Sequence, residues 1–407
     1  MRHIPWILSA SVFAASTACA VAPAVIGSQT GGSVLPSTVL NTTAGIQTDD
    51  RDIAPPAANR AQVRVKLDTE GTLVGNERQF RLVARQAARG QGDRATGKLH
   101  ALDAKGVEQP LARVTYEVRT GDKAETKLTG TDGAFDAPGT AGGQITFRLA
   151  NNHWSLTGKN GSYSWVLPIT SGGDVGVVMP ETGSANAQAA WIHLLFVKAE
   201  DKLQGYGVGL EWWKTPIRTI WPGDADYYSG GTLNLTGAQQ WDVNGHELGH
   251  ALTDQAFNMR FGGGQHYIDR CYDPTIAWSE GVASFVSAVI SIDPADPDAK
   301  FEFMVPRRAP LRYENVPTDV CEGQENEWRV GAACWDLFDT HGDGKDTVAL
   351  PLPTIWKAWS KGNGAKPIAS LSDAYQLILK AAPSQADALK QVMAQNTMPF
   401  SVLAVTR

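Results

Sequence analysis

The feature that most constrains this chain is a His-Glu-x-x-His stretch at residues 246–250. No proline interrupts residues 242–260, and apolar residues recur there at roughly helical spacing, which predicts an α-helix. Residues four apart lie on one face of a helix, so His246 and His250 can offer their imidazole nitrogens to one metal ion. Glu247 lies beside them as a carboxylate that can take a proton from a metal-bound water.

A catalytic zinc site needs a third protein ligand and one open position. The best candidate is Glu280, which lies farther along the chain in a Trp-Ser-Glu-Gly-Val-Ala-Ser-Phe segment. A loop and a second helix would bring this segment back onto the first helix. We therefore predict one zinc ion, held by His246, His250 and Glu280, with Glu247 as the general base. The competing interpretation of the motif alone is a buried helix with two hydrogen-bonded histidines.

The two segments together resemble those of the gluzincin zinc metallopeptidases, in which the third ligand is a Glu on a later helix. The first segment is more similar to the thermolysin-type helix, and the segment around Glu280 to the aminopeptidases of that clan. The resemblance covers roughly residues 185–345. It implies a peptidase that hydrolyses peptide bonds through Glu-assisted attack of a zinc-bound water.

Three departures from these families bear on the mode of action. The exopeptidase motif Gly-Ala-Met-Glu-Asn of the aminopeptidases is absent, which favours an endopeptidase. Ser279 replaces the usual Asn before the ligand Glu, and Ser284 stands where thermolysin-like enzymes carry an Asp that orients a zinc-bound His. Two alternatives stay open: an aminopeptidase of the same clan, and a non-catalytic surface-binding protein on a gluzincin scaffold.

The resemblance also implies a residue that stabilises the oxyanion of the tetrahedral intermediate. The candidates are His341, Arg329, Tyr313 and His266, and position after Glu280 favours the first two.

A short strand is expected immediately before the zinc helix. In this clan the equivalent strand borders the cleft, and its free edge can pair with an extended peptide. We therefore expect Gly231, Thr232 and Leu233 to bind substrate.

The amino-terminal region has the composition of an export signal followed by a spacer. Residues 1–24 combine a basic start, a short apolar run and small residues, so we expect a secreted, periplasmic or cell-surface protein. Two cleavage patterns compete: an ordinary signal-peptidase site, and a lipobox in which Cys19 is lipidated and attaches the protein to a membrane. Residues 25–60, rich in Gly, Ser, Thr, Pro and Ala, predict a flexible linker.

The remainder of the chain predicts two domains of an α+β protein. Residues 61–180 contain short alternating runs separated by turn signals, the pattern of an antiparallel β-sandwich, which we interpret as an accessory domain. Residues 181–407 are expected to form a gluzincin-like catalytic domain with a small sheet and a mainly helical carboxyl-terminal part. The net charge of −6 and the lack of a long basic run argue against a nucleic-acid partner and leave a peptide or protein substrate.

Cysteines and an acidic stretch complete the candidate sites. Cys271 and Cys321 lie in loop-like stretches whereas Cys334 lies in an apolar helix, so a bridge between the first two is preferred. Asp339, Asp343 and Asp346 suit a calcium loop, although a solvated turn over residues 340–345 is the favoured interpretation.

Overall fold

The computed structural model describes residues 38–40, 46–47, 72–74, 77–84, 92–159, 161–181, 184–398 and 400. They all belong to one compact unit, Val34–Arg407. Strands and helices are both abundant, consistent with the α+β class. No helix in the described part of the chain is long and apolar enough to cross a membrane. The expected export signal at 1–24, with Cys19, lies outside the described residues.

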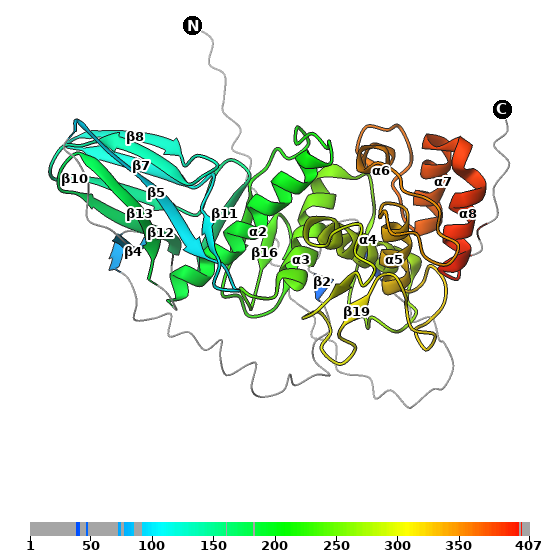
Figure 1. Cartoon of the computed structure of the whole chain (residues 1–407). Helices are drawn as coiled ribbons and strands as arrows, with labels where there is room; N and C mark the ends of the chain where they lie inside the picture. Colours follow the sequence, from blue (N-terminus) through cyan, green and yellow to red (C-terminus); the bar gives the residue numbers. More distant parts are fainter. Residues whose placement is uncertain are drawn as a thin grey trace, which may run out of the picture. The chain divides into compact units, whose positions relative to one another are not determined.

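Strands dominate the described chain up to Pro180 (Figure 1). They are β3 (Thr72–Val74), β4 (Glu77–Ala84), β5 (Arg94–Leu102), β6 (Glu108–Pro110), β7 (Thr115–Thr120), β8 (Lys123–Leu128), β9 (Ala134–Pro138), β10 (Gly143–Arg148), β11 (Trp154–Gly158), β12 (Gly161–Ile169) and β13 (Gly173–Pro180). Buried and exposed residues alternate along β5, as expected for a strand with one face in a core.

Two groups of strands share one core in this region. One group runs β4-β12-β10-β7-β8 and the other places β5 between β13 and β9. Phe135 of β9 packs against Phe147 of β10 and Tyr116 of β7, with ring centroids 5.1 Å and 6.5 Å apart. Such contacts between two groups of strands are typical of a β-sandwich. The expectation of a purely antiparallel one is corrected, because β4 pairs in parallel with β12 and β5 with β13.

The sheet continues past residue 180 into the helical region. β11 pairs in parallel with β14 (Ile217–Ile220), which pairs with β16 (Thr232–Asn234), and β16 pairs with β15 (Tyr227–Ser229). Backbone hydrogen bonds therefore join the expected accessory and catalytic regions. Periodicity in the sequence identifies single strands but does not reveal such a pairing across a domain boundary.

Two short strands fall inside the stretch expected to be a linker. β1 (Thr38–Leu40) pairs with β17 (Phe261–Gly263), and β2 (Ile46–Gln47) pairs with β15, both antiparallel. The prediction of a uniformly flexible tether over 25–60 is therefore corrected for these residues. Pairing through backbone groups needs no apolar alternation, so the composition gave no sign of it.

The remaining described elements are mostly helices. They are α2 (Ala185–Gly205), α3 (Trp241–Ala256), α4 (Pro274–Ser291), α5 (Glu327–Asp336), α6 (Leu352–Trp359), α7 (Leu371–Ala381), a 3-10 turn η1 (Pro383–Gln385) and α8 (Ala386–Gln395), with the short strands β18 (Lys300–Phe301) and β19 (Leu311–Arg312). The carboxylate of Asp273 caps α4 by accepting from the backbone N–H of Thr275 at 2.8 Å.

Glycine allows α3 and α4 to approach closely. A Cβ on Gly249 would lie 2.4 Å from the carbonyl oxygen of Ala283, and a Cβ on Gly245 would lie 2.3 Å from Ser287 Oγ. The first contact is with backbone that cannot rotate away, whereas the second is with a side-chain hydroxyl. Close helix packing thus explains the two poor helix formers beside the histidines.

We expect Gly249→Ala to lower the free energy of unfolding by about 1–3 kcal/mol, because the added methyl group pushes α3 away from the α4 backbone. Gly245→Ala is the matched control. It should lower the free energy of unfolding by less, since the Ser287 side chain can change rotamer. Urea denaturation followed by circular dichroism measures both. Equal losses in the two variants would show that the Ala283 contact does not limit the helix spacing.

Candidate metal centre

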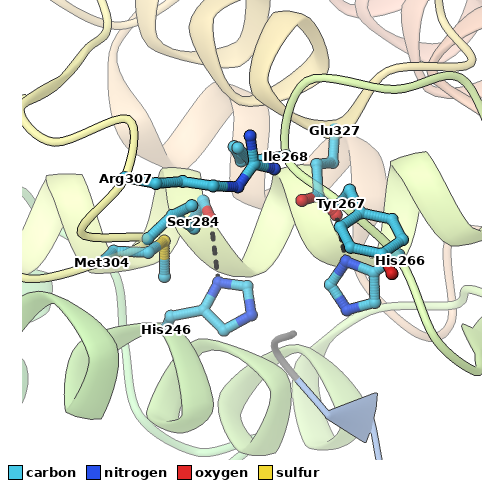
Figure 2. A pocket seen from close by; sticks show the side chains of 9 residues that line it. His246, His266, Tyr267, Ile268, Ser284, Met304, Arg307 and Glu327 are labelled. Atoms are coloured by element: carbon cyan, nitrogen blue, oxygen red, sulfur yellow. Dashed lines mark hydrogen bonds and ion pairs between the residues drawn. The ribbon is translucent and has the colours of Figure 1, made fainter. Parts of the chain in front are cut away.

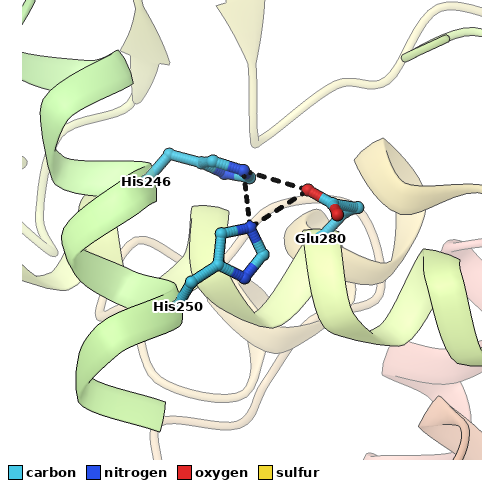
Figure 3. Close-up of side chains that lie close together, drawn as sticks. All are labelled: His246, His250 and Glu280. Carbon is cyan, nitrogen blue, oxygen red and sulfur yellow. Dashed lines mark hydrogen bonds and ion pairs between the residues drawn. The ribbon is translucent and has the colours of Figure 1, made fainter. Parts of the chain in front are cut away.

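Two imidazoles and one carboxylate meet between α3 and α4 (Figure 3). His246 Nε2 lies 3.0 Å from both Glu280 Oε2 and His250 Nε2, and His250 Nε2 lies 3.2 Å from Glu280 Oε2. All three side chains are buried. Ligand atoms of a tetrahedral zinc ion at about 2.0–2.1 Å lie roughly 3.3–3.4 Å apart, so this triangle fits a zinc ion closely.

The surroundings give these groups the charge states that a metal ion needs. Burial lowers the pKa of His246 to about 4, so its imidazole is neutral at neutral pH. Burial alone would raise the pKa of Glu280, but the neighbouring His266 and His250 hold it below its usual range, so the carboxylate is charged. Neutral imidazole and ionised carboxylate are the forms that coordinate a cation.

Ser284 fulfils the orienting role for which the sequence offered no carboxylate. Its Oγ lies 2.8 Å from His246 Nδ1, and it is also hydrogen-bonded to the buried hydroxyl of Tyr313. When His246 Nδ1–H donates to Ser284, the Nε2 lone pair faces His250 and Glu280. In metal sites, a hydrogen bond to the ring nitrogen that does not bind the metal holds the imidazole in one orientation and one tautomer, and the Ser284 hydroxyl can make this bond.

Glu247 is fully buried, directly after His246 on α3. The structure thus places the predicted general base on the helix that supplies two of the candidate ligands.

A second ionisable pair borders the triad. His266 Nδ1 lies 2.8 Å from Glu327 Oε2, and His266 Nε2 lies 3.7 Å from Glu280 Oε1. Figure 2 shows the rings of His246 and His266 on opposite sides of one pocket, with Ser284 and Glu327 in its lining.

Glu327 is a site residue that the sequence analysis missed. It is the first residue of α5 and is buried. A carboxylate at the first position of a helix was the available signal, but acidic first turns are common because they suit the helix dipole.

The two favoured oxyanion candidates lie elsewhere. The Arg329 guanidinium donates to the carbonyl oxygens of Cys321, Val320 and Pro317 at 2.8, 3.0 and 3.2 Å. His341 Nδ1 lies 3.5 Å from Glu314 Oε2. Neither residue lines the pocket between His246 and His266.

The expected substrate strand has neighbours on both sides. Thr232 is paired with Arg218 of β14 and with Ser229 of β15, and Leu233 is flanked in the same way. The backbone N–H of Gly231 donates to the Tyr228 hydroxyl. The expectation of a free edge at Gly231–Leu233 is therefore corrected: β16 has a strand on each side, and β15 in turn pairs with β2.

A disulfide joins Cys271 and Cys321, whose Cα atoms are 5.6 Å apart. It connects the loop before α4 to the loop before α5, the helices that carry Glu280 and Glu327. Cys334 is a buried free thiol.

A buried set of two His and one Glu on adjacent helices is a donor set known from catalytic zinc sites. In agreement, the family model of the mycolysin C-terminal domain matches residues 198–389, a range that contains every residue of the triad and the His266–Glu327 pair. The match supports a peptidase of a zinc-dependent family.

The other comparisons add no argument. No curated protein matches the chain. Among solved structures, a 9R-lipoxygenase from Cyanothece PCC8801 matches with 13% identity over 32% of this chain and 28% of that chain, with a TM-score of 0.13. The chain thus spans less than a third of that enzyme, and a TM-score this low establishes no common fold.

Proposed function

We propose that this protein is a zinc-dependent peptidase whose metal ion is held by His246, His250 and Glu280. The observation that carries the proposal is the buried triangle of two imidazole nitrogens and one carboxylate oxygen, 3.0–3.2 Å apart. Three donor atoms this close repel one another unless a cation or protons lie between them.

The residues around the triad support peptide hydrolysis. Zinc, when bound, would polarise the scissile carbonyl group and lower the pKa of the attacking water. Glu247 takes the proton of that water during the attack and then delivers it to the leaving amine. Burial of Glu247 keeps solvent away from the proton that it carries.

We assign the oxyanion-stabilising role to His266 rather than to His341 or Arg329. Its ring shares the pocket of His246, and Glu327 fixes it through Nδ1, so that Nε2 points towards Glu280. A ring held in this way is preorganised to donate to a developing negative charge.

Replacing His266 with Ala should lower kcat by about 10²- to 10³-fold and leave the zinc content unchanged, because the variant loses a donor used in the transition state. Glu327→Gln should lower kcat by a smaller factor, about 10-fold or more, because the His266 ring loses its carboxylate partner. Gln265→Ala, an exposed neighbour in the same loop, is the control. Steady-state kinetics and elemental analysis measure both effects, and loss of zinc from His266→Ala would instead make His266 part of the metal site.

We further propose an exported endopeptidase. The signal-like residues 1–24 support export, and the missing exopeptidase motif supports internal cleavage. An aminopeptidase, by contrast, would fail to cleave peptides with blocked amino termini.

The purified wild-type protein should contain about one zinc ion per chain and lose peptide hydrolysis when a chelator removes it. Activity should return on addition of zinc. Elemental analysis and cleavage of an internally quenched peptide, with and without an amino-terminal block, provide the measurements. A protein that binds no zinc and cleaves no peptide would favour the surface-binding alternative.

A further inference from the structure

A second cluster of ionisable groups lies around the end of α5, and the mechanism above does not use it. Asp336, Asp339 and Asp346 offer carboxylate oxygens that all lie within 4.8 Å of one another. All three side chains are buried, with exposed fractions of 2%, 1% and 5%. Residues 340–345, which the sequence favours as a solvated turn, are exposed or half-buried, so the burial is confined to Asp339 and Asp346 on either side of them.

The cluster lacks a compensating positive charge within the described part of the chain. Neighbours contribute only neutral donors: the Asn396 amide to Asp336 Oδ2 at 2.7 Å and the backbone N–H of Val348 to Asp346 Oδ1 at 2.9 Å. Among the described residues, the charged neighbours that act on the three carboxylates are other acids, namely one another, Asp343 and Glu314. Burying several carboxylates together without a cation is costly.

One oxygen in the cluster has no hydrogen-bond partner. Asp339 accepts from the backbone N–H of His341 through Oδ2 at 3.1 Å, whereas its Oδ1 is buried and unpartnered. Asp339 belongs both to the group with Asp336 and Asp346 and to a group with Glu314 and His341. A buried carboxylate oxygen without a hydrogen-bond partner, on a residue grouped with other carboxylates, calls for an explanation such as a bound cation.

We propose that Asp336, Asp339 and Asp346 bind a calcium ion. Hard oxygen ligands favour calcium over zinc, which prefers nitrogen and sulfur. Oxygens on opposite sides of a calcium ion are about 4.6–5.2 Å apart, so a set within 4.8 Å of one another fits around one ion. Magnesium fits less well because it demands a near-octahedral shell and retains its waters.

The ion would stabilise the part of the fold that supports the zinc-site helices. Asp336 ends α5, which begins at Glu327, and Asn396 follows α8. Val330 of α5 packs against Gly281 of α4, where a Cβ would lie 2.5 Å from Val330 Cγ1. Calcium would therefore fix α5 against α4 and α8, and its removal should lower Tm before it affects zinc binding.

The proposal is tested on the full chain, treated with a calcium-selective chelator and with zinc retained. Wild type should bind about one calcium ion by isothermal titration calorimetry, and millimolar calcium should raise Tm by about 3–8 °C, with little effect of magnesium. Asp339→Asn should weaken calcium binding at least about tenfold and abolish the shift. Asp122→Asn, which removes an exposed carboxylate from the β7–β8 turn, should behave as wild type.

A second measurement serves if Asp339→Asn fails to fold. The indole N–H of Trp335 donates to Glu314 Oε1 at 3.0 Å, and Glu314 shares a group with Asp339, so Trp335 lies near the proposed ion. Terbium bound in place of calcium should emit on indole excitation, calcium should quench that emission, and Trp335→Phe should weaken it. The proposal is overturned if the wild-type protein binds no calcium, or if Asp339→Asn binds calcium as tightly as wild type. It is also overturned if wild type contains a second zinc ion that only Asp339→Asn lacks.

Discussion

Replacing Glu247 with Gln should lower kcat for peptide hydrolysis by about 10³-fold or more while the protein keeps its zinc. General-base catalysis typically contributes about 10²- to 10⁴-fold, and the amide of Gln cannot accept the proton of the attacking water. The substitution preserves size, and the candidate ligands His246, His250 and Glu280 are untouched. Initial rates on a quenched peptide and elemental analysis of the same sample measure the two quantities.

Asp254→Asn is the matched control for this experiment. It removes a carboxylate from the same helix, where Asp254 Oδ2 accepts from the Tyr228 hydroxyl at 2.5 Å. Its kcat should stay close to that of wild type. If Glu247→Gln keeps its activity, Glu247 is not the base; if it loses zinc, the carboxylate supports the metal site instead.

The zinc triad could be anticipated from the sequence because its geometry is local. Four-residue spacing on one helix fixes His246 and His250 relative to each other whatever the rest of the fold does. Glu280 required the further step of a second helix, which the Glu-Gly-Val-Ala-Ser-Phe segment indicated. The structure shows α4 packed against α3 through Gly249, which brings Glu280 to both rings.

The supporting residues could not be derived because they come from distant segments. Glu327 meets His266 only through the folding of α5 beside the loop before α4, and no spacing rule connects the two. Likewise, the free edge expected from the resemblance is absent from β16, which pairs with both β14 and β15. The burial of Asp339 and Asp346 beside the 340–345 turn could not be foreseen, because composition does not distinguish a solvated carboxylate from a buried one.

Glu280→Ala should weaken zinc binding by about 10²-fold or more, because it removes the one charged oxygen of the triad. Ser284→Ala should have a smaller effect, about 10- to 100-fold, because it leaves the ligand atoms in place and removes the hydrogen bond to His246 Nδ1. Competition with a fluorescent zinc chelator ranks the affinities, and circular dichroism checks the fold.

Ser287→Ala is the control, since its hydroxyl lies on the same helix but donates to the carbonyl oxygen of Asp242. A Glu280→Ala protein that binds zinc as tightly as wild type would require another third ligand. His266 would be the first residue to examine, because its Nε2 lies 3.7 Å from Glu280 Oε1. In that case His266→Ala would lose zinc as well as activity, and the oxyanion role would pass to a different residue.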